Sequence, residues 1–186
     1  MTVGDVALYV GAFLGHKNLP RLVSAFATTD FCRDGGRLVL VGGSQAQADE
    51  LLGQITGAQR SSVSVKPACT QEELDVLFAS SLFLVQPSLE EGFGLPVWEA
   101  QCRGLPVCAS DGGSLPEVVG GYATPFPAAS TPAMAAAIDE CARRARARTA
   151  ERAQQIESMR TRAPTVGQFG GQFQAVVDRR LRARGT

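Results

Sequence analysis

The chain is 186 residues long and 45% hydrophobic, which suits one domain that buries roughly two-thirds of the surface its unfolded form would expose. Its 18 basic and 18 acidic residues cancel, so no overall field attracts nucleic acid or an anionic membrane. Any bound anion must therefore be held by local groups.

The five cysteines argue against a disulfide framework or a zinc site, because they are odd in number, widely spaced and never form a C-x-x-C pair. The N-terminus has no basic leader, and no run approaches the roughly 20 apolar residues of a membrane span. We expect a cytoplasmic protein with no nucleic-acid partner. The arginine-rich stretch at 143–152 reads as a solvated helix face, so membrane contact is at most peripheral.

Short apolar runs rich in Val and Leu recur along the chain, and helix-period segments separate them. Their unbroken apolar character is typical of strands that are covered on both faces of a parallel sheet. The strands are expected at residues 7–10, 38–41, 63–65, 82–86, 106–109 and, as a short one, near 122–123.

The intervening helices carry start signals. Thr70 and Glu73 form a capping box, Pro96 suits a first helical turn, and Thr131 is a plausible cap before Pro132. The helices are expected at residues 19–27, 45–55, 71–78, 96–103, 114–119, 131–147 and 166–181. The alternation predicts a Rossmann-like doubly wound α/β fold, a parallel sheet of about six strands with helices on both faces and ligands at the carboxyl ends of the strands.

Three glycine-bearing loops, at 11–18, 42–44 and 90–94, follow expected strands and lead into helices. Glycine lets backbone N–H groups approach an anion, and a helix N-terminus adds donors and a partial positive charge. Neither G-x-x-x-x-G-K-[ST] nor a G-x-G-x-x-G in the first βα turn is present, which counts against a P-loop enzyme and a dinucleotide reader. A tight turn with close helix packing is the alternative interpretation of 42–43.

Two carboxylates, Glu91 and Glu99, lie on either side of the turn Gly-Phe-Gly-Leu-Pro. A carboxylate can accept hydrogen bonds from two neighbouring sugar hydroxyls, each worth about 1.5–3 kcal/mol. The alternative is that acidic residues simply favour a helix N-terminus, by about 0.3–1 kcal/mol. Composition alone leaves the two interpretations equal. Trp98, inside the following helix, is expected in the core.

The stretch 88–120, SLEEGFGLPVWEAQCRGLPVCASDGGSLPEVVG, resembles the donor-binding signature of retaining glycosyltransferases of family four, which have the GT-B fold. The matching features are the Glu-x7-Glu pair at Glu91 and Glu99, the E-G-F-G-L-P turn, G-x-P-V at 104–107 and S-L-P-E-V at 114–118. Upstream, LYVGAFLGHKNLPRLVSAF, LVLVGG and TQEELDVLFASS are similar to earlier units of the same donor domain. The likeness covers almost the whole chain.

The resemblance implies roles for individual residues. Lys17 matches the lysine that neutralises the donor diphosphate, Glu99 the carboxylate that holds the ribose, and Glu91 the catalytic carboxylate that faces the donor sugar. The remaining donor-binding positions are Gly92, Phe93, Gly94 and Leu95 of the turn, Gly11 and His16 of the first loop, and Lys66 and Pro67 beside the base. His16 and Ala12 depart from the arginines that relatives commonly have there, which leaves Lys17 as the main phosphate cation.

The resemblance also implies the reaction. Family enzymes move a sugar from a nucleoside diphosphate donor with retention of configuration, and protein cations and helix dipoles rather than a metal or cofactor stabilise the leaving diphosphate. A hexose, with GDP-mannose as one candidate donor, would pass to a glycan or lipid-linked acceptor in bacterial polysaccharide synthesis. A covalent intermediate on Glu91 and transfer on one face of the sugar both stay open.

The chain reads as a single donor-binding domain, 1–186, the C-terminal half of a GT-B enzyme. In full-length relatives a helix corresponding to 165–186 packs on the N-terminal domain, which supplies the acceptor site. We therefore expect this hexosyltransferase domain to bind donor without efficient transfer unless a partner chain or the missing domain is present. The alternatives are a non-catalytic nucleotide-binding or scaffolding subunit of a split glycosyltransferase and an NAD-dependent Rossmann enzyme.

Overall fold

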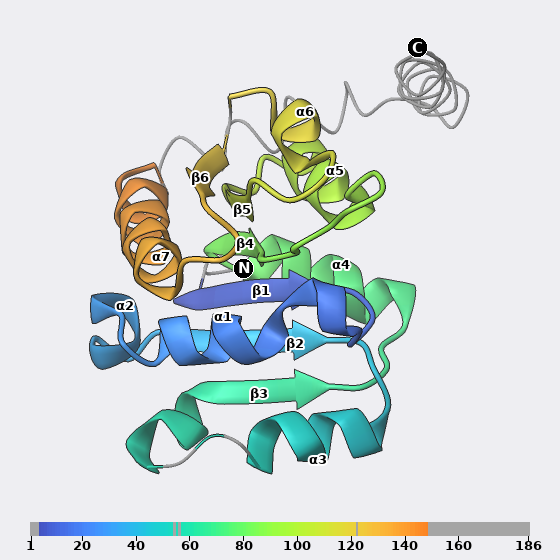
Figure 1. The fold of residues 1–186 in the computed structure, drawn as a ribbon, viewed down its shortest axis with the longest axis vertical. Helices are drawn as coiled ribbons and strands as arrows, with labels where there is room; N and C mark the ends of the chain where they lie inside the picture. The colour runs from blue at the N-terminus through green and yellow to red at the C-terminus, as the bar shows by residue number, and fades with distance from the viewer. Residues whose placement is uncertain (1–3, 54, 56, 122, 149–186) are drawn as a thin grey trace.

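A computed structural model of the protein describes residues 4–53, 55, 57–121 and 123–148. Its centre is a sheet of six parallel strands in the order β3-β2-β1-β4-β5-β6 (Figure 1). The strands are β1 (Val6–Val10), β2 (Arg37–Val41), β3 (Val63–Lys66), β4 (Phe83–Gln86), β5 (Val107–Ser110) and β6 (Ala123–Phe126). The predicted Rossmann-like doubly wound fold is confirmed.

Helices cover both faces of this sheet. The α-helices are α1 (Leu19–Phe26), α2 (Asp30–Arg33), α3 (Gln45–Gly53), α4 (Gln71–Ser80), α5 (Leu95–Cys102), α6 (Leu115–Val119) and α7 (Thr131–Ala147), and the 3₁₀ segments are η1 (Gly15–Lys17) and η2 (Gly57–Ser62). The sequence did not predict α2 or the 3₁₀ segments. The helix expected at 166–181, within 165–186, lies outside the described residues. Within the described residues, no helix combines the length and apolar content that a membrane span needs.

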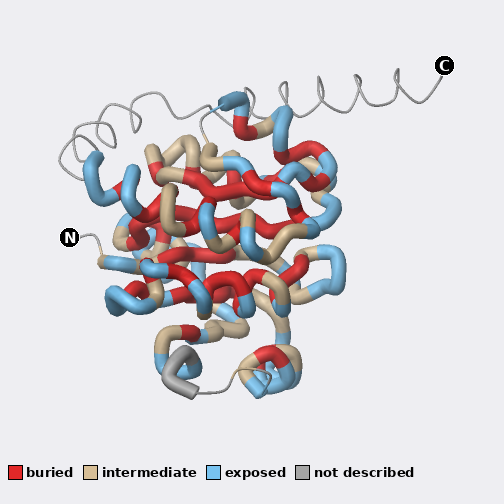
Figure 2. Tube along the Cα trace, turned by 60° about the vertical axis from the view of Figure 1, so that its left-hand side comes forward, coloured by how far each residue is buried: buried red, intermediate tan, exposed pale blue. Residues whose placement is uncertain are grey.

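Alternate residues of each strand pack into two separate apolar layers. Ala7 and Tyr9 of β1 face a cluster with α1, α2, α3 and α7, whereas Leu8 faces a cluster with α4, α5 and α6. This is the period-2 alternation of a strand that is buried on both faces. The buried residues follow the strands through the middle of the molecule (Figure 2).

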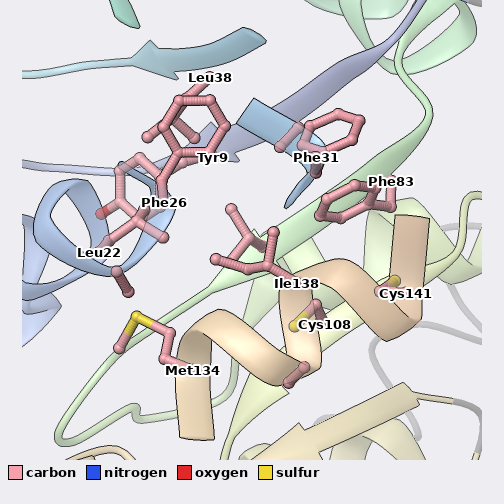
Figure 3. Packing of buried hydrophobic residues seen from close by; sticks show 14 of the residues in the cluster. Tyr9, Leu22, Phe26, Phe31, Leu38, Phe83, Cys108, Met134, Ile138 and Cys141 are labelled. Carbon is pink, nitrogen blue, oxygen red and sulfur yellow. The ribbon is translucent and has the colours of Figure 1, made fainter. Parts of the chain in front are cut away.

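The first layer holds most of the aromatic core. Phe31 of α2 lies between Phe26 and Phe83, with ring centroids 6.2 and 5.4 Å apart. Met134, Ile138 and Cys141 of α7 fill the other side of this cluster (Figure 3). The short helix α2 is thus fixed by tertiary packing, which explains why its four residues gave no helical signal.

The structure confirms one of the predicted helix caps and corrects another. The capping box at Thr70 and Glu73 is present, with Glu73 N–H donating to Thr70 Oγ1 at 3.2 Å and Thr70 N–H to the Glu73 carboxylate at 2.8 Å. The cap of α7 is Ser130 rather than Thr131, and its hydroxyl accepts from Ala133 N–H at 3.3 Å. The prediction that Trp98 lies in the core was wrong, because it is only partly buried.

Candidate functional site

The strand order places the loops that follow β1 and β4 side by side at the carboxyl edge of the sheet. β1 and β4 are neighbours in the sheet, but β1 leads into α1 on one face and β4 leads into α5 on the other. In doubly wound sheets, ligands bind at such a switch point, beyond the carboxyl ends of the strands. A backbone hydrogen bond of 2.8 Å from Leu89 N–H to His16 C=O joins the two loops there.

Lys17 and Glu91 meet at this switch point. The Lys17 ammonium Nζ lies 2.7 Å from Glu91 Oε2, although 74 residues separate them in the chain. Their side chains are only 14% and 11% exposed. Water therefore screens this pair less than it screens an ion pair on the open surface, and the pair fixes the relative position of the two loops.

Two more donors hold the same carboxylate oxygen. Gln86, the last residue of β4, donates from Nε2 to Glu91 Oε2 at 3.0 Å, and Ser88 donates from Oγ at 3.0 Å. Gln86 Nε2 also donates to Ser88 Oγ at 3.0 Å. Both donors are buried, so the charge of Glu91 is balanced by one cation and two neutral donors.

Asn18 fastens the first loop to two other loops. It is buried and adopts the left-handed conformation, with φ of 60°. Its amide Nδ2 donates to the carbonyls of Pro87 at 3.0 Å and Ala128 at 2.9 Å, and its Oδ1 accepts from Arg21 at 2.8 Å. Because Asn18 follows Lys17 directly, these bonds restrict where the ammonium can lie.

The loop after β5 supports the backbone of the carboxylate-bearing turn. Ser114 donates to the Glu91 carbonyl from both its backbone N–H and its hydroxyl, each at 3.1 Å. A Cβ on Gly113 would lie 2.4 Å from that carbonyl oxygen, and one on Gly112 would lie 2.1 Å from the Ser88 oxygen. Both positions therefore need glycine, since the two backbones touch here.

Tyr9 of β1 lies in the core near the Lys17–Glu91 pair. Its hydroxyl donates to the Ala12 carbonyl at 3.0 Å and so ties the start of the first loop to β1. Burial, with a smaller contribution from the negative charge of Glu91, raises the pKa of Tyr9 well above its ordinary value. Tyr9 is therefore a neutral hydrogen-bond donor at any physiological pH.

The glycine turn after Glu91 is compact and leads straight into α5. Gly94 is the N-cap of α5 and adopts φ of 81°, a conformation that other residues rarely take. Gly92 is exposed, Leu95 is 47% exposed, and Phe93 is partly buried with its ring 6.3 Å from that of Trp98. The turn thus presents backbone groups and one apolar side chain to solvent.

Glu99 lies further along α5, and its described ionic neighbours are Arg103 and Asp75 rather than Lys17. Arg103 Nη1 lies 3.9 Å from Glu99 Oε2 and also bonds Asp75 at 2.7 Å through Nη2. Burial raises the pKa of Glu99, Asp75 adds to the rise, and Arg103 opposes it. The side chain is 42% exposed, so it is partly accessible to solvent.

The remaining predicted residues lie around the same strand ends. The Gly11 N–H donates to the Val41 carbonyl at 3.0 Å, and the His16 side chain is exposed. Lys66 ends β3, and its ammonium is bound to Glu73 at 2.7 Å in a partly exposed pair. Pro67, which follows, is partly buried. Gly11 directly follows β1, Lys66 ends β3 and Pro67 directly follows it, whereas His16 lies further along the first loop, in η1.

Sequence reasoning missed the residues that support the pair. Gln86 and Asn18 gave weak signals, a single amide at the end of an apolar run and an asparagine just before a helix with proline in its first turn. Ser88 and Ser114 lie within the quoted signature but were given no role of their own, and Ser110, the last residue of β5, gave no signal. In the described residues, no group of three or more His, Cys, Asp or Glu side chains is arranged to hold a metal ion.

Comparison with known proteins identifies the architecture. Residues 4–158 match the family model described as glycosyl transferases group 1. The chain belongs to this glycosyltransferase family. The expected membership in the family-four glycosyltransferases with the GT-B fold is thereby confirmed.

Several relatives are similar over part of their length. The O-antigen chain mannosyltransferase B of Escherichia coli is 34% identical over 116 residues, which are 61% of this chain and 30% of that protein. The MMP alpha-(1->4)-mannosyltransferase of Mycolicibacterium hassiacum is 48% identical over 58 residues, 31% of this chain and 14% of that protein. The chain therefore spans a minor part of the curated glycosyltransferases it matches.

A solved structure supports the fold assignment. Anabaena HepE, crystallised with UDP-glucose, aligns with a TM-score of 0.73 and 21% identity. The alignment covers 94% of this chain and 49% of HepE. The six-stranded unit thus corresponds in fold to about half of HepE.

Proposed function

We propose that this chain is the donor-binding domain of a retaining hexosyltransferase, and that it binds a nucleoside diphosphate sugar at the switch point between β1 and β4. In the complete enzyme, a second domain or a partner chain would supply the acceptor site. The donor would lie across the loops that follow β1 and β4, with its diphosphate near Lys17 and its sugar near Glu91.

The Lys17–Glu91 pair is the observation that carries this proposal. An ammonium has three hydrogens, and Glu91 takes one of them at 2.7 Å, which leaves two for phosphate oxygens. Glu91 brings a carboxylate next to the same point, where it can accept from sugar hydroxyls. A cation for the diphosphate and an acceptor for the sugar are therefore joined in one rigid unit.

The other proposed contacts extend from this unit. Glu99 would accept the ribose hydroxyls, which agrees with its partly exposed side chain. The backbone of 92–95 at the start of α5 would approach the donor, and residues Lys66 and Pro67 would border the base. Gly11 and His16 would line the phosphate side of the first loop.

The identity of the sugar is argued from relatives. Two of the similar proteins are mannosyltransferases by name, and HepE, which is similar in fold, was solved with UDP-glucose. A mannosyl donor, GDP-mannose, is therefore our first choice, and UDP-glucose is the matched alternative. Glu91 faces the sugar in either course of the reaction, through a covalent bond or on a single face of the donor.

Nucleotide binding can be tested on the 186-residue chain itself by thermal shift with UDP, GDP and ADP at 1 mM. A ligand present at 100 times its dissociation constant adds about 2.7 kcal/mol to the free energy of unfolding. For a domain of this size that corresponds to a rise in Tm of roughly 5–10 °C. One of the three nucleotides should produce this rise, and Lys17→Met should remove most of it.

NAD and AMP serve as comparison ligands. Neither should raise the Tm as much as the preferred nucleoside diphosphate. If none of the diphosphates stabilises the protein at millimolar concentration, donor binding is refuted. Stabilisation by NAD alone would instead favour a dinucleotide enzyme.

A non-catalytic nucleotide-binding subunit is the second candidate. It is favoured by the first loop, in which Lys17 is the only Lys or Arg among residues 11–18 and is already bound to Glu91. Adding a candidate acceptor-domain chain and measuring sugar transfer separates the two functions. Transfer that disappears in Glu91→Ala identifies the enzyme, and nucleotide binding without transfer in every such pairing identifies the subunit.

A further inference from the structure

We propose that Gln86 and Ser88 are positioning residues that hold Glu91 by one carboxylate oxygen and so turn the other oxygen toward the donor sugar. This inference rests on the proposed function, because it assigns the cause of sugar recognition within the same site. It concerns two buried side chains that precede the glycine turn and that would not themselves touch the donor.

The hydrogen bonds to the Glu91 carboxylate are unevenly divided between its two oxygens. Lys17 Nζ at 2.7 Å, Gln86 Nε2 at 3.0 Å and Ser88 Oγ at 3.0 Å all donate to Oε2. Among the described side chains, none of the hydrogen bonds to this carboxylate ends on Oε1. Three donors saturate one carboxylate oxygen, so Oε1 is the atom left to accept from a sugar hydroxyl.

The two donors also hold each other. Gln86 Nε2 donates to Ser88 Oγ at 3.0 Å, and the Ser88 hydroxyl in turn donates to Glu91. Gln86 is 1% exposed and Ser88 is 0% exposed, so neither can change rotamer without disturbing the core. Gln86 and Ser88 therefore hold the Glu91 carboxylate from the side of the sheet, in fixed positions.

The backbone below this carboxylate is fixed independently. The Ser88 carbonyl accepts from Ser110 Oγ at 2.6 Å, and the Glu91 carbonyl accepts twice from Ser114 at 3.1 Å. The main-chain position of the turn therefore does not depend on Gln86. What Gln86 and Ser88 add is the orientation of the Glu91 side chain, which is the property that recognition of a sugar hydroxyl requires.

Gln86 is costly for the fold, which favours a functional reason for it. Its Oε1 is buried and has no hydrogen-bond partner among the described residues. An unsatisfied buried polar atom typically costs about 1–3 kcal/mol, so an apolar side chain of the same length would fill the end of β4 at less cost. The presence of an amide here is explained if its Nε2 is needed at Glu91.

A structural role and a positioning role make different predictions for two ligands. If Gln86 and Ser88 only support the fold, their loss weakens the binding of the nucleoside diphosphate and of the sugar nucleotide to the same extent. If they orient Glu91, their loss weakens the binding of the sugar nucleotide alone, because Lys17 still contacts the diphosphate. The decisive quantity is the ratio of the two dissociation constants, which a general loss of stability does not move.

The experiment is calorimetric titration of the 186-residue chain with the preferred nucleoside diphosphate and its sugar nucleotide, GDP with GDP-mannose or UDP with UDP-glucose. Gln86→Met and Ser88→Ala are compared with Gln101→Met, a control that removes a glutamine bond of 3.1 Å to the Val119 carbonyl, remote from Glu91 in the hydrogen-bond network. Gln86→Met should raise the dissociation constant of the sugar nucleotide about tenfold, or about 1.4 kcal/mol, and Ser88→Ala three- to tenfold. The dissociation constant of the diphosphate should stay within twofold of the wild-type value in both variants. Gln101→Met should leave the ratio of the two constants unchanged.

Equal weakening of both ligands, or an unchanged ratio in both variants, overturns the inference while nucleotide binding stands. If Gln86→Met does not fold, the ratio measured in Ser88→Ala decides the question. A wild-type chain that binds no nucleoside diphosphate overturns the proposed function, and the positioning role falls with it.

Discussion

Lys17 and Glu91 form an ion pair of 2.7 Å that joins the loop after β1 to the loop after β4. The lysine is proposed to bind the diphosphate and the glutamate to face the sugar, so the pair couples the two halves of donor recognition. Before a donor binds, each charge partly neutralises the other. Removing one charge should therefore raise the affinity for the nucleoside diphosphate, and removing the other should lower it.

Glu91→Gln should raise the affinity for the nucleoside diphosphate about three- to tenfold, because Lys17 loses its counter-charge and its whole charge faces the phosphates. Lys17→Met should lower that affinity at least tenfold. Titration calorimetry at 50 mM and 300 mM salt measures both effects, and the gain in Glu91→Gln should shrink at high salt.

Arg143→Met is the control for loss of one positive charge, since Arg143 is an exposed partner of Glu140 on α7. It should leave nucleotide affinity within twofold. Weaker diphosphate binding in Glu91→Gln would contradict the coupling of the two charges and would instead indicate that Glu91 supports the loop itself.

Asn18 should be a major determinant of the stability of the site. Asn18→Ala removes the hydrogen bonds to Pro87 and Ala128 and should cost about 2–4 kcal/mol. That corresponds to a fall in Tm of roughly 5–15 °C. Asn18→Gly loses the same bonds but tolerates the left-handed φ of 60°, so it should be about 1 kcal/mol less harmful. Chemical denaturation of the two variants measures the difference, and equal losses would show that backbone conformation contributes nothing here.

The sequence could predict the layout of this site but not its internal contacts. Apolar runs and helix caps depend on neighbouring residues, so the strands and the capping box at Thr70 were readable. The motif around Glu91 and Glu99 was recognisable because its spacing is fixed along the chain. The contact between Lys17 and Glu91 spans 74 residues and arises from strand order, which no local pattern encodes.

The errors have physical causes of the same kind. Trp98 was expected in the core because it lies inside a helix that packs on the sheet, but α5 turns Val97 and Ala100 inward and leaves Trp98 beside Phe93. Gln86 ends a strand that is otherwise fully apolar, and its importance depends on Glu91, five residues later and beyond a turn. Such side-chain relationships require the folded geometry.

Gly113 should be intolerant of a side chain because of Glu91. A methyl group there would lie 2.4 and 2.5 Å from the Glu91 carbonyl oxygen and nitrogen, at a backbone φ of 61°. Gly113→Ala should therefore cost about 1–3 kcal/mol from overpacking, in addition to about 1 kcal/mol from the backbone. It should also lower nucleotide-sugar affinity more than tenfold, because Glu91 must shift.

Gly120→Ala is a matched control, since Gly120 has a similar φ of 53° but open space around the added methyl group. Its cost should be limited to the backbone contribution, and its donor affinity should stay unchanged. Equal destabilisation of the two variants by denaturant titration would argue against the close approach of the 112–114 loop to Glu91.

Glu99 should oppose stability at neutral pH while serving the ribose. Burial raises the pKa of its carboxyl in the folded protein above the unfolded value, so folding favours the protonated form. The stabilising contribution of the protonated Glu99 carboxyl is fully present below its unfolded pKa, and it is lost as the pH rises through its folded pKa. Glu99→Gln, which stays neutral, should thus be slightly more stable than the wild type at pH 7, by on the order of 1 °C in Tm because the side chain is 42% exposed.

The difference in Tm between Glu99→Gln and the wild type should shrink as the pH falls through the folded pKa of Glu99 and vanish below the ordinary glutamate pKa of about 4.3. Glu50→Gln, on the exposed side of α3, is the comparison for the loss of one surface carboxylate. In Glu99→Gln the proposed ribose contact is lost, so nucleotide affinity should fall about tenfold at pH 7. A variant that is both more stable and a poorer binder indicates that Glu99 is kept for its ligand. Unchanged affinity would remove Glu99 from the donor site and leave its motif position as a feature of α5 alone.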